Sequence, residues 1–281
     1  MNAISWEFAT VFWRDMIRFG RFRTLLFSSL LQPAIWMAFF GIAMSSNFNR
    51  FGSFAPAPDG VTAIGYLTFM AAGVIAMTSM FTSLSGGMSL LFDKTFGLMR
   101  EMLASPMPRS HLLAGIGLSG VVKACIQSVI IMVFGLAIGV GFFPGKTLVG
   151  IAVSVAGILI FVGVFSLGFL FLSSAIALKQ ESHEGMQGII TMLSMPLFFT
   201  SNALYPVDNF PLVLKAIAVV NPLTYLVTGI RSFAIGNEFY AFGREYCYTQ
   251  ADILFAFGAL CLFTLVTFAL AWHSVKRVSL T

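Results

Sequence analysis

Charged residues are scarce in this sequence: Asp, Glu, Lys and Arg make up 10% of its 281 residues, and hydrophobic residues make up 58%. A soluble globular domain carries about 25% charged residues, which it needs to cover a surface that faces water. So few charges exclude a single large soluble domain. The apolar residues form continuous runs rather than the ~10-residue alternating segments of a membrane barrel, so the sequence predicts an all-α membrane protein.

Cysteine and histidine are sparse as well, with three residues of each. Cys125 and Cys261 fall inside apolar runs and Cys247 falls in a polar stretch, so neither a disulfide framework nor a CxxC metal site is indicated. The stretch HEGMQ at 183–187 begins like a zinc-binding helix, but Gln187 stands where the second histidine is needed. We expect no metal site and no cofactor bound directly to this chain.

Six apolar runs are each about as long as a membrane span, which needs roughly 20 residues. The second run is longer than one bilayer requires, so we expect it to tilt or to project into the cytoplasm. The runs lie at 25–45, 61–91, 112–142, 148–178, 186–204 and 251–272. The whole chain, 1–281, is therefore predicted to form one domain of six transmembrane helices.

The basic residues give the orientation of the spans, because Lys and Arg loops are retained on the cytoplasmic side. If the N-terminus is inside, more basic residues fall in inner segments than in outer segments. The inner set is Arg14, Arg18, Arg21, Arg23, Lys94, Arg100, Arg109, Lys179, Lys276 and Arg277, and the outer set is Arg50, Lys146, Lys215, Arg231 and Arg244. Both termini are thus expected in the cytoplasm.

An amphipathic pattern precedes the first span, at 3–22. One stripe at helical spacing is basic, and the opposite stripe is mostly aromatic. The basic residues are Arg14, Arg18 and Arg21, and the apolar residues are Phe8, Phe12, Met16 and Phe19. This pattern favours a helix that lies in the headgroup plane of the membrane. The alternative is an ordinary helix packed on the rest of the chain.

The segment 205–235 precedes the last span and contains two apolar pieces, about 212–220 and 223–235, that are too short to cross a bilayer. Asn221 and Pro222 separate them, and a residue before proline avoids helical geometry. Two half-length helices joined there could enter the membrane from the outside and return. The alternative is a hairpin on the outer surface.

No motif in the chain carries enzyme chemistry. The stretch GFFPGKT at 141–147 resembles a phosphate-binding loop, but the spacing between its glycines is wrong and it falls in an outer segment. The spans contain Lys123 but no pair of acidic residues, whereas ion-coupled transporters carry acidic or histidine relays in the membrane. If the chain moves a solute uphill, the energy is expected to come from another subunit.

Two segments are specific enough to indicate a family: LMREMLASPMPRSHLLAG between the second and third spans, and NPLTY at 221–225 before the last span. Together with the basic N-terminal helix, they resemble the type 2 class of ATP-binding-cassette export permeases, which includes daunorubicin-resistance, nodulation-factor and polysaccharide exporters. The likeness covers nearly the whole chain. Its most specific residues are Arg100, Glu101, Ser105, Pro106 and Arg109 in the first segment, and Asn221, Pro222 and Tyr225 in the second.

The resemblance implies a permease that forms a homodimer in a prokaryotic inner membrane and docks on two separate ATPase subunits, where ATP and Mg²⁺ bind. It also implies that 94–110 is a coupling helix that contacts the ATPase. The charges of Arg100, Glu101 and Arg109 suit contacts with a partner, and Pro106 and Pro108 break the chain before the third span. The alternative is a connecting loop that only carries inner positive charge.

The resemblance places the transport path at the dimer interface, lined by the first, second and fifth spans. The candidate lining residues are Thr78, Phe81, Thr82 and Ser85 in the second span and Phe198, Phe199, Thr200 and Asn202 in the fifth. Ordinary helix packing is the alternative for each of them. An amphipathic drug, a lipid, or a glycolipid or polysaccharide is the expected substrate. An ion-coupled secondary transporter and a membrane scaffold that transports nothing remain alternative functions.

Overall fold

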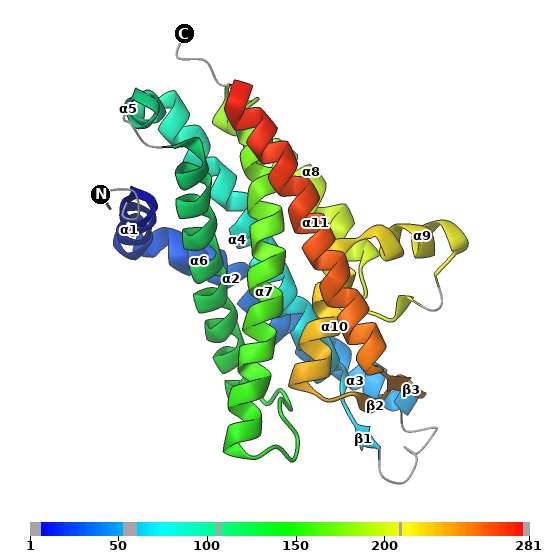
Figure 1. Ribbon diagram of the computed structural model, residues 1–281. Helices are drawn as coiled ribbons and strands as arrows, with labels where there is room; N and C mark the ends of the chain where they lie inside the picture. Colours follow the sequence, from blue (N-terminus) through cyan, green and yellow to red (C-terminus); the bar gives the residue numbers. More distant parts are fainter. Residues whose placement is uncertain (1–6, 53–60, 105–107, 208–209, 278–281) are drawn as a thin grey trace.

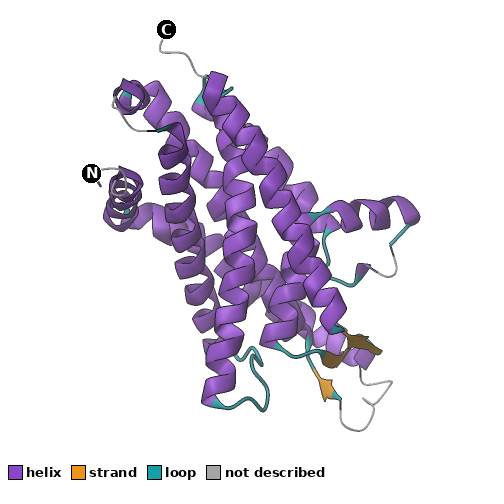
Figure 2. Ribbon diagram, viewed as in Figure 1, coloured by secondary structure: helices purple, strands orange, loops and turns teal. Residues whose placement is uncertain are grey.

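The computed structural model describes residues 7–52, 61–104, 108–207 and 210–277, and most of them are helical (Figure 2). Five helices are long and apolar enough to cross a membrane. One combines three elements near the N-terminus and runs over Leu26–Asn47, and the others are α4 (Tyr66–Thr95), α6 (Arg109–Ala137), α7 (Leu148–Ala177) and α11 (Gln250–Arg277). These five confirm the first, second, third, fourth and sixth predicted spans.

The first span is not a uniform helix. It consists of α2 (Arg23–Ile35), the π-helical turn η1 (Trp36–Gly41) and α3 (Ile42–Gly52). Pro33 lies inside α2 and has no backbone N–H to donate to the preceding turn. A π-helical turn accommodates a disruption of this kind by widening the helix for one turn.

The most buried helix of the bundle is α4, which packs against α6, α7, α8 and α10. Small residues on α4 allow close helix contacts, as they do in many membrane helix pairs. Gly87, for example, approaches the backbone of Ser173 so closely that a Cβ atom would lie 2.6 Å from its carbonyl oxygen. The core therefore lies along α4, with α7 packed against it and α11 packed against α7 on the face shown in Figure 1.

Two short helices lie across the direction of the long ones and are seen nearly end-on in Figure 1. They are α1 (Glu7–Arg21) and α5 (Leu98–Ala104). Both lie toward the end of the bundle at which α11 ends, which we call the α5 end. The helix predicted at 3–22 is present over its described residues, Glu7–Arg21, and lies across the bundle axis; residues 3–6 lie outside the described residues.

The opposite end carries a small sheet with the strand order β1–β2–β3. β1 (Thr62–Ala63) pairs in parallel with β2 (Glu238–Ala241), which pairs antiparallel with β3 (Arg244–Cys247). Phe242 and Gly243 have positive φ angles of 55° and 75°, as the two central residues of a tight type I′ hairpin turn require. The loop between α6 and α7 lies at this same end, which we call the sheet end.

The fifth predicted span differs from the structure. The run 186–204 forms α8 (His183–Thr200), which is not among the five described helices that are long and apolar enough to span. Its first turns contain His183, Glu184 and Gln187, and its last helical residue falls four residues before the predicted end. The predicted fifth run is therefore helical over most of its length, but the polar residues in its first turns make α8 less apolar than the five long helices.

Two short helices follow α8: α9 (Leu212–Val220) and α10 (Pro222–Ala234), bent by 74° at the break between them. The two pieces predicted on either side of Asn221 and Pro222 are therefore present. In Figure 1, α9 projects sideways from the bundle, and α10 runs toward the sheet end. The pair counts as a sixth span only if it is taken as one broken helix.

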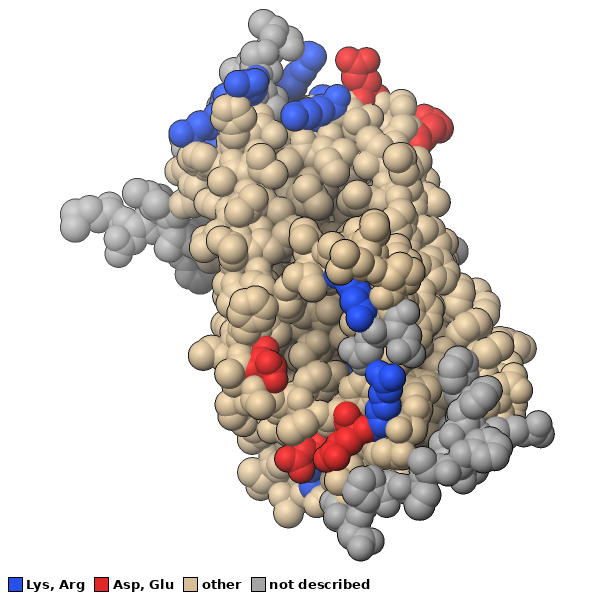
Figure 3. Space-filling view, turned by 90° about the vertical axis from the view of Figure 1, so that its right-hand side faces the viewer, with Lys and Arg blue, Asp and Glu red and all other residues tan. Residues whose placement is uncertain are grey.

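The surface is consistent with a membrane location. Figure 3 shows charged side chains at the upper end of one face and in its lower half, with a band of uncharged residues between them. Exposed apolar side chains are abundant on α2, α6, α7 and α11 and include Phe27, Val133, Val153 and Leu265. A surface of this kind suits contact with lipid rather than water.

Candidate functional site

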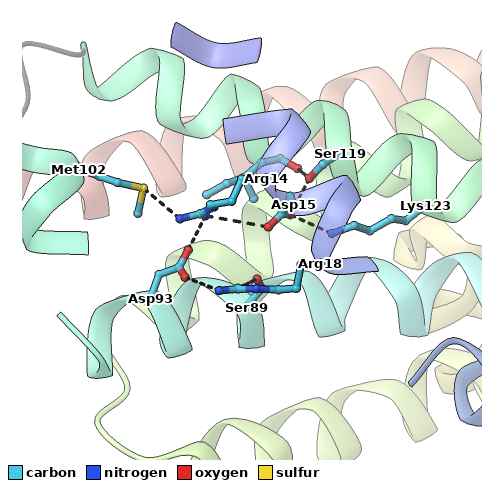
Figure 4. A network of polar contacts seen from close by, with 9 residues as sticks. Arg14, Asp15, Arg18, Ser89, Asp93, Met102, Ser119 and Lys123 are labelled. Atoms are coloured by element: carbon cyan, nitrogen blue, oxygen red, sulfur yellow. Dashed lines mark hydrogen bonds and ion pairs between the residues drawn. The ribbon is translucent and has the colours of Figure 1, made fainter. Parts of the chain in front are cut away.

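An ion cluster joins the surface helix α1 to the bundle near the α5 end (Figure 4). Its centre is Asp93, in the last turn of α4, whose side chain is 1% exposed. Arg14 Nη2 donates to Asp93 Oδ2 over 2.6 Å, and Arg18 Nη2 donates to Asp93 Oδ1 over 3.2 Å. Arg18 also donates to Ser89 Oγ on α4 over 2.9 Å. Both arginines of α1 therefore bind one carboxylate of the most buried helix.

A second carboxylate, Asp15, ties α1 to α6. It accepts hydrogen bonds of 2.8 Å from both Lys123 Nζ and Ser119 Oγ. Burial alone raises the pKa of Asp15, but the ammonium of Lys123, these hydrogen bonds and the guanidinium of Arg14 together lower the pKa below its ordinary value. Asp15 is therefore ionised at neutral pH and holds α1 against α6. We call Arg14, Asp15, Arg18, Asp93 and Lys123 the α1 ion cluster.

The cluster also reaches α5, the helix in the predicted coupling segment. Arg14 Nη1 lies 3.4 Å from the Sδ atom of Met102 on α5. Met99, one turn earlier on α5, is buried with Val11 of α1 and Leu90 of α4 in one apolar cluster. Contacts at Arg14 thus connect α1, α4 and α5 at a single point.

These contacts give two residues of the predicted basic stripe, Arg14 and Arg18, partners within the protein. Both are turned toward the bundle because Asp93 offers a buried carboxylate there. Arg21 is exposed, and so is Trp13, at 65% of its surface. Tryptophan favours the membrane interface, so the exposed face of α1 still suits that location. The predicted aromatic stripe is half-buried against the protein.

The predicted coupling segment 94–110 is not one helix. α4 ends at Thr95, Gly97 adopts a positive φ of 81°, and α5 begins at Leu98. Arg100 and Glu101 on α5 are exposed at the α5 end, and neither side chain bonds to another described residue. Ser105 and Pro106 lie outside the described residues.

Arg109 has a different role from Arg100 in the structure. Its Nη1 donates to the carbonyl oxygens of Val275 and Lys276 over 3.0 and 2.9 Å. A cation at this position satisfies free carbonyls at the end of α11 and complements the helix dipole. Lys94 does the same after α7, where its Nζ donates to the carbonyls of Leu178 and Gln180. Both cations hold helix ends together inside the chain.

The structure separates the predicted path residues by exposure. Thr78 and Phe198 are buried, and Thr78 Oγ1 donates to the Val74 carbonyl of its own helix. Thr82 donates to the amide oxygen of Gln127 on α6. Ser85 and Phe199 are exposed, whereas Phe81, Thr82 and Thr200 are half-buried. Of the eight candidates, those open to the surface of a single chain are thus mainly Ser85 and Phe199.

An aromatic cluster connects the first span to α8 beside these residues. Trp36 of η1 packs edge-on against Phe198 and Phe199, with ring centroids 6.2 and 6.5 Å apart. Phe40, one turn later, packs against Trp36 at 5.1 Å. The first and fifth predicted path elements are therefore in direct contact within one chain.

Asn221 joins the end of α8 to the start of α10. Its Nδ2 donates to the Leu197 carbonyl over 2.6 Å and to Thr200 Oγ1 over 3.1 Å, and its Oδ1 accepts from the backbone N–H of Leu223 over 2.9 Å. One amide thus bonds a carbonyl and a hydroxyl near the end of α8 and a free N–H group in the first turn of α10. Pro222 occupies the first helical position of α10, where a missing N–H costs nothing.

Tyr225 closes the bend between α9 and α10. Its hydroxyl donates to the Val219 carbonyl, near the C-terminus of α9, over 2.5 Å. The NPLTY segment therefore builds the bent pair: Asn221 caps, Pro222 starts the helix and Tyr225 ties back to the preceding one. These contacts give the segment a structural role.

The sequence did not predict the buried positions of three charged residues, Asp15, Asp93 and Arg231. Asp15 was overlooked because it stands beside Arg14 in a basic stripe, and Asp93 because it follows the apolar run that was counted as the second span. Both acids are paired with cations, so neither forms an open ion relay. Arg231 was counted as an outer loop charge, but it is 1% exposed inside α10. Its position within an apolar helical run was the available signal.

The rejected phosphate-like loop 141–147 does hold a structural lysine. Lys146 Nζ donates to Ser154 Oγ and to the Phe233 carbonyl over 2.7 and 2.6 Å, and partial burial lowers its pKa. The backbone N–H of Phe143 donates to the Ala234 carbonyl over 2.7 Å. The loop therefore binds the end of α10. Within the described part of the chain, no three His, Cys, Asp or Glu side chains group as a metal would need.

Comparison with known proteins agrees with this architecture. Residues 7–235 match the ABC-2 type transporter family. The chain belongs to this family. It is 30% identical to the protein described as transport permease ycf38 of Cyanophora paradoxa, over 94% of this chain and 87% of the relative. This ABC-2 chain is therefore a membrane transport permease subunit of an ABC transporter.

Two bacterial relatives are similar over most of their length. The daunorubicin resistance ABC transporter permease protein DrrB1 of Streptomyces coeruleorubidus is 24% identical over 90% of this chain and 83% of the relative. The inner membrane transport permease YadH of Escherichia coli K12 is 22% identical over 99% of this chain and 98% of the relative. The resemblance inferred from the sequence is thus confirmed at the level of the family.

Proposed function

We propose that this ABC-2 permease works as the membrane half of an ATP-driven exporter: two copies form the path, and two separate ATPase subunits bind ATP and Mg²⁺. The observation that carries the proposal is the position of α5. Its charged residues Arg100 and Glu101 are exposed at one end of the bundle, while Met99 and Met102 on the same helix contact α1 and α4. Because α5 is exposed to a partner on one side and contacts α1 and α4 on the other, a displacement of α5 by an ATPase would be transmitted to these two helices.

The α1 ion cluster supplies the connection for that movement. A partner that displaces α5 would act on Arg14 through Met102, and Arg14 is bonded to Asp93 at the end of α4. α4 continues from there through the core of the chain to the sheet end. The cluster therefore offers a direct mechanical route from a cytoplasmic ATPase to the helices beside the proposed path.

The proposed orientation of the chain in the membrane follows from the proposed contact between α5 and a cytoplasmic ATPase. The α5 end, which also carries the basic C-terminal turn of α11 with Lys276 and Arg277, is proposed to face the cytoplasm of a prokaryotic cell. The sheet end then faces outward. Residues 205–235 enter from that side, and both termini lie inside.

The proposed substrate is an amphipathic drug, lipid or glycolipid. In support, the surface near the proposed path is apolar and aromatic, with Phe39, Met192 and Phe199 exposed, and Ser85 and Thr200 provide hydroxyls. The daunorubicin resistance of one relative is a further argument for an amphipathic drug. A polysaccharide remains a second candidate by the family resemblance.

ATPase assays in lipid nanodiscs test this proposal. The chain is purified together with its ATP-binding-cassette subunit, and ATP hydrolysis is measured with lipids, glycans and amphipathic drugs added in turn. We expect hydrolysis to require both proteins and one amphiphile class to stimulate it. A chain that purifies without any ATPase, and that moves an amphiphile in proteoliposomes under a proton or sodium gradient without ATP, would contradict the proposal.

A further inference from the structure

The guanidinium of Arg231 lies where the chain between α8 and α9 leaves helical geometry. Arg231 is the largest of the fully buried side chains, at 1% exposure, and comes from the last turn of α10. Among the described residues, no carboxylate forms an ion pair with it. A buried cation without an anion is costly in a membrane, so its position needs a specific explanation.

Backbone carbonyls take the place of the missing anion. Arg231 Nη2 donates to the carbonyl oxygens of Asn202 and Ala203 over 2.7 and 3.2 Å, and Arg231 Nε and Nη2 both reach the Phe69 carbonyl on α4 over 3.4 and 3.2 Å. The guanidinium carbon also lies 3.5 Å from the centre of the Phe69 ring, within range of a cation–π contact. Three carbonyl dipoles and one ring face thus surround the charge, and the Tyr248 side chain also interacts with it.

Asn202 and Ala203 need such a partner because α8 has already ended at Thr200. Non-helical backbone at membrane depth must find hydrogen bonds within the protein. The stretch is also pressed against α4: a Cβ atom on Gly73 would lie 2.4 Å from the Ala203 carbonyl oxygen. It therefore sits between Gly73 on one side and Arg231 on the other.

α8 and α10 follow one another along α4. Both pack on α4, and together they have about as many residues as α7, which runs the whole length of the bundle. Asn221 bonds the end of α8 to the start of α10, and Arg231 bonds the stretch in between. α9 is a sideways excursion that leaves from this junction and returns to it.

Broken helices in ion-coupled transporters use the carbonyls at the break to coordinate Na⁺ or another ion. Here a side chain of the protein itself occupies the equivalent position. We propose that Arg231 is a tethered cation that satisfies the break between α8 and α10 and keeps it closed against α4, so that the break needs no ion from solution. Arg231 is a positioning residue in this assignment, and its role concerns the chain alone.

Thiol accessibility at the break tests the proposal. Ser201, fully buried beside Asn202, is changed to Cys in a chain whose Cys125, Cys247 and Cys261 are replaced by Ala, and labelling by a maleimide is followed in nanodiscs. We expect Arg231→Met to label at least tenfold faster than the parent, and Arg231→Lys within about threefold of it. Equal rates for Met and Lys, or a Met variant as protected as the parent, would overturn the proposal.

Two further experiments with added solutes separate the effect of the Arg231 charge from the effect of the space that its side chain fills. With Arg231→Ala, guanidinium at tens of millimolar is expected to restore protection, and urea, which has the same shape without the charge, is not. Equal effects of the two solutes would mean that filling the space is sufficient, which contradicts a tethered cation. Replacing Na⁺ by choline should leave the parent rate unchanged, and a change would place a solution ion at the break.

The purified chain is used without its ATPase, so the result is independent of the proposed function. If Arg231→Met is not recovered in folded form, Arg231→Gln is compared with Arg231→Lys in the same assay. Protection in Lys but not in Gln supports the proposal, and equal labelling rates in the two variants contradict it.

Discussion

Arg14 donates to Asp93 over 2.6 Å, and this contact joins a helix on the surface of the bundle to the most buried helix within it. The same guanidinium reaches Met102 on α5. Because α5 presents Arg100 and Glu101 outward, the contact stands between a surface suited to a partner and the core of the permease.

Asp93→Asn should destabilise the chain by about 1–3 kcal/mol. The substitution removes the charge that Arg14 and Arg18 share, and the cost is below that of a fully buried pair because both arginines are partly exposed. Thermal unfolding of the purified chain measures the effect. Glu245→Gln, an exposed residue of β3, is the matched control and should change stability by less than about 0.5 kcal/mol. Indistinguishable midpoints for the two variants would refute this role of Asp93.

Asp15 gives the α1 ion cluster a pH dependence with a definite sign. Because Lys123 and Ser119 hold its pKa below the ordinary value of 3.8, its contribution is present above that value and is lost as pH falls through the lower folded pKa. The stability difference between the parent and Asp15→Asn should be constant from about pH 5 to 8. It should shrink below about pH 4, as thermal midpoints across pH would show. A difference that vanishes already near pH 6 would contradict the assignment.

Asn221 should be more sensitive to Ala than to Ser. Ala removes both the cap on Leu223 and the donation to Leu197, whereas a Ser hydroxyl can still accept from the Leu223 N–H. We expect a loss of about 2–3 kcal/mol for Asn221→Ala and about half of that for Asn221→Ser. Thermal unfolding in one detergent compares them. Equal losses of stability in Asn221→Ala and Asn221→Ser would show that the hydrogen bond to Leu197 and the cap on Leu223 do not contribute separately.

Cys247 reports which side of the membrane the sheet end faces. It is exposed on β3, whereas Cys125 and Cys261 are partly buried in the spans. A membrane-impermeant maleimide should label intact cells through Cys247, and Cys247→Ser should abolish the signal. Desolvation and the nearby Glu238 and Glu245 carboxylates raise the thiol pKa, so labelling should keep rising with pH above the range of an ordinary thiol. Labelling only after the cells are permeabilised would reverse the proposed orientation.

Much of the fold could be predicted because hydrophobic length alone identifies a span. Five of the six runs became helices that can cross a membrane, and the break at Asn221 and Pro222 followed from the local geometry before a proline. The end of α8 could not be predicted because it is set by tertiary contacts: Asn221 and Arg231 satisfy the backbone from other parts of the chain. Those contacts have no signature in the run 186–204 itself.

The polar sites were harder to predict, because a charge shows its role only through its partner. Arg14 and Arg18 share Asp93, which lies far away in sequence, so their pattern on the helix alone does not indicate this partner. Arg109, predicted as a coupling residue, donates to carbonyls at the end of α11. Only Arg100 and Glu101 of the predicted coupling residues are described as exposed and available. They remain the residues on which coupling to an ATPase is proposed to depend.

Charge reversal on α5 tests the central claim most directly. Arg100→Glu combined with Glu101→Arg is compared with Arg244→Glu, an exposed residue at the sheet end, by measuring the affinity for the ATP-binding-cassette subunit and the ATP hydrolysis of the complex in nanodiscs. We predict about a tenfold weaker complex for the α5 variant, equivalent to ~1.4 kcal/mol, with a matching loss of hydrolysis, and no change for Arg244→Glu. An α5 variant that binds the ATPase and hydrolyses ATP like the parent would contradict the account.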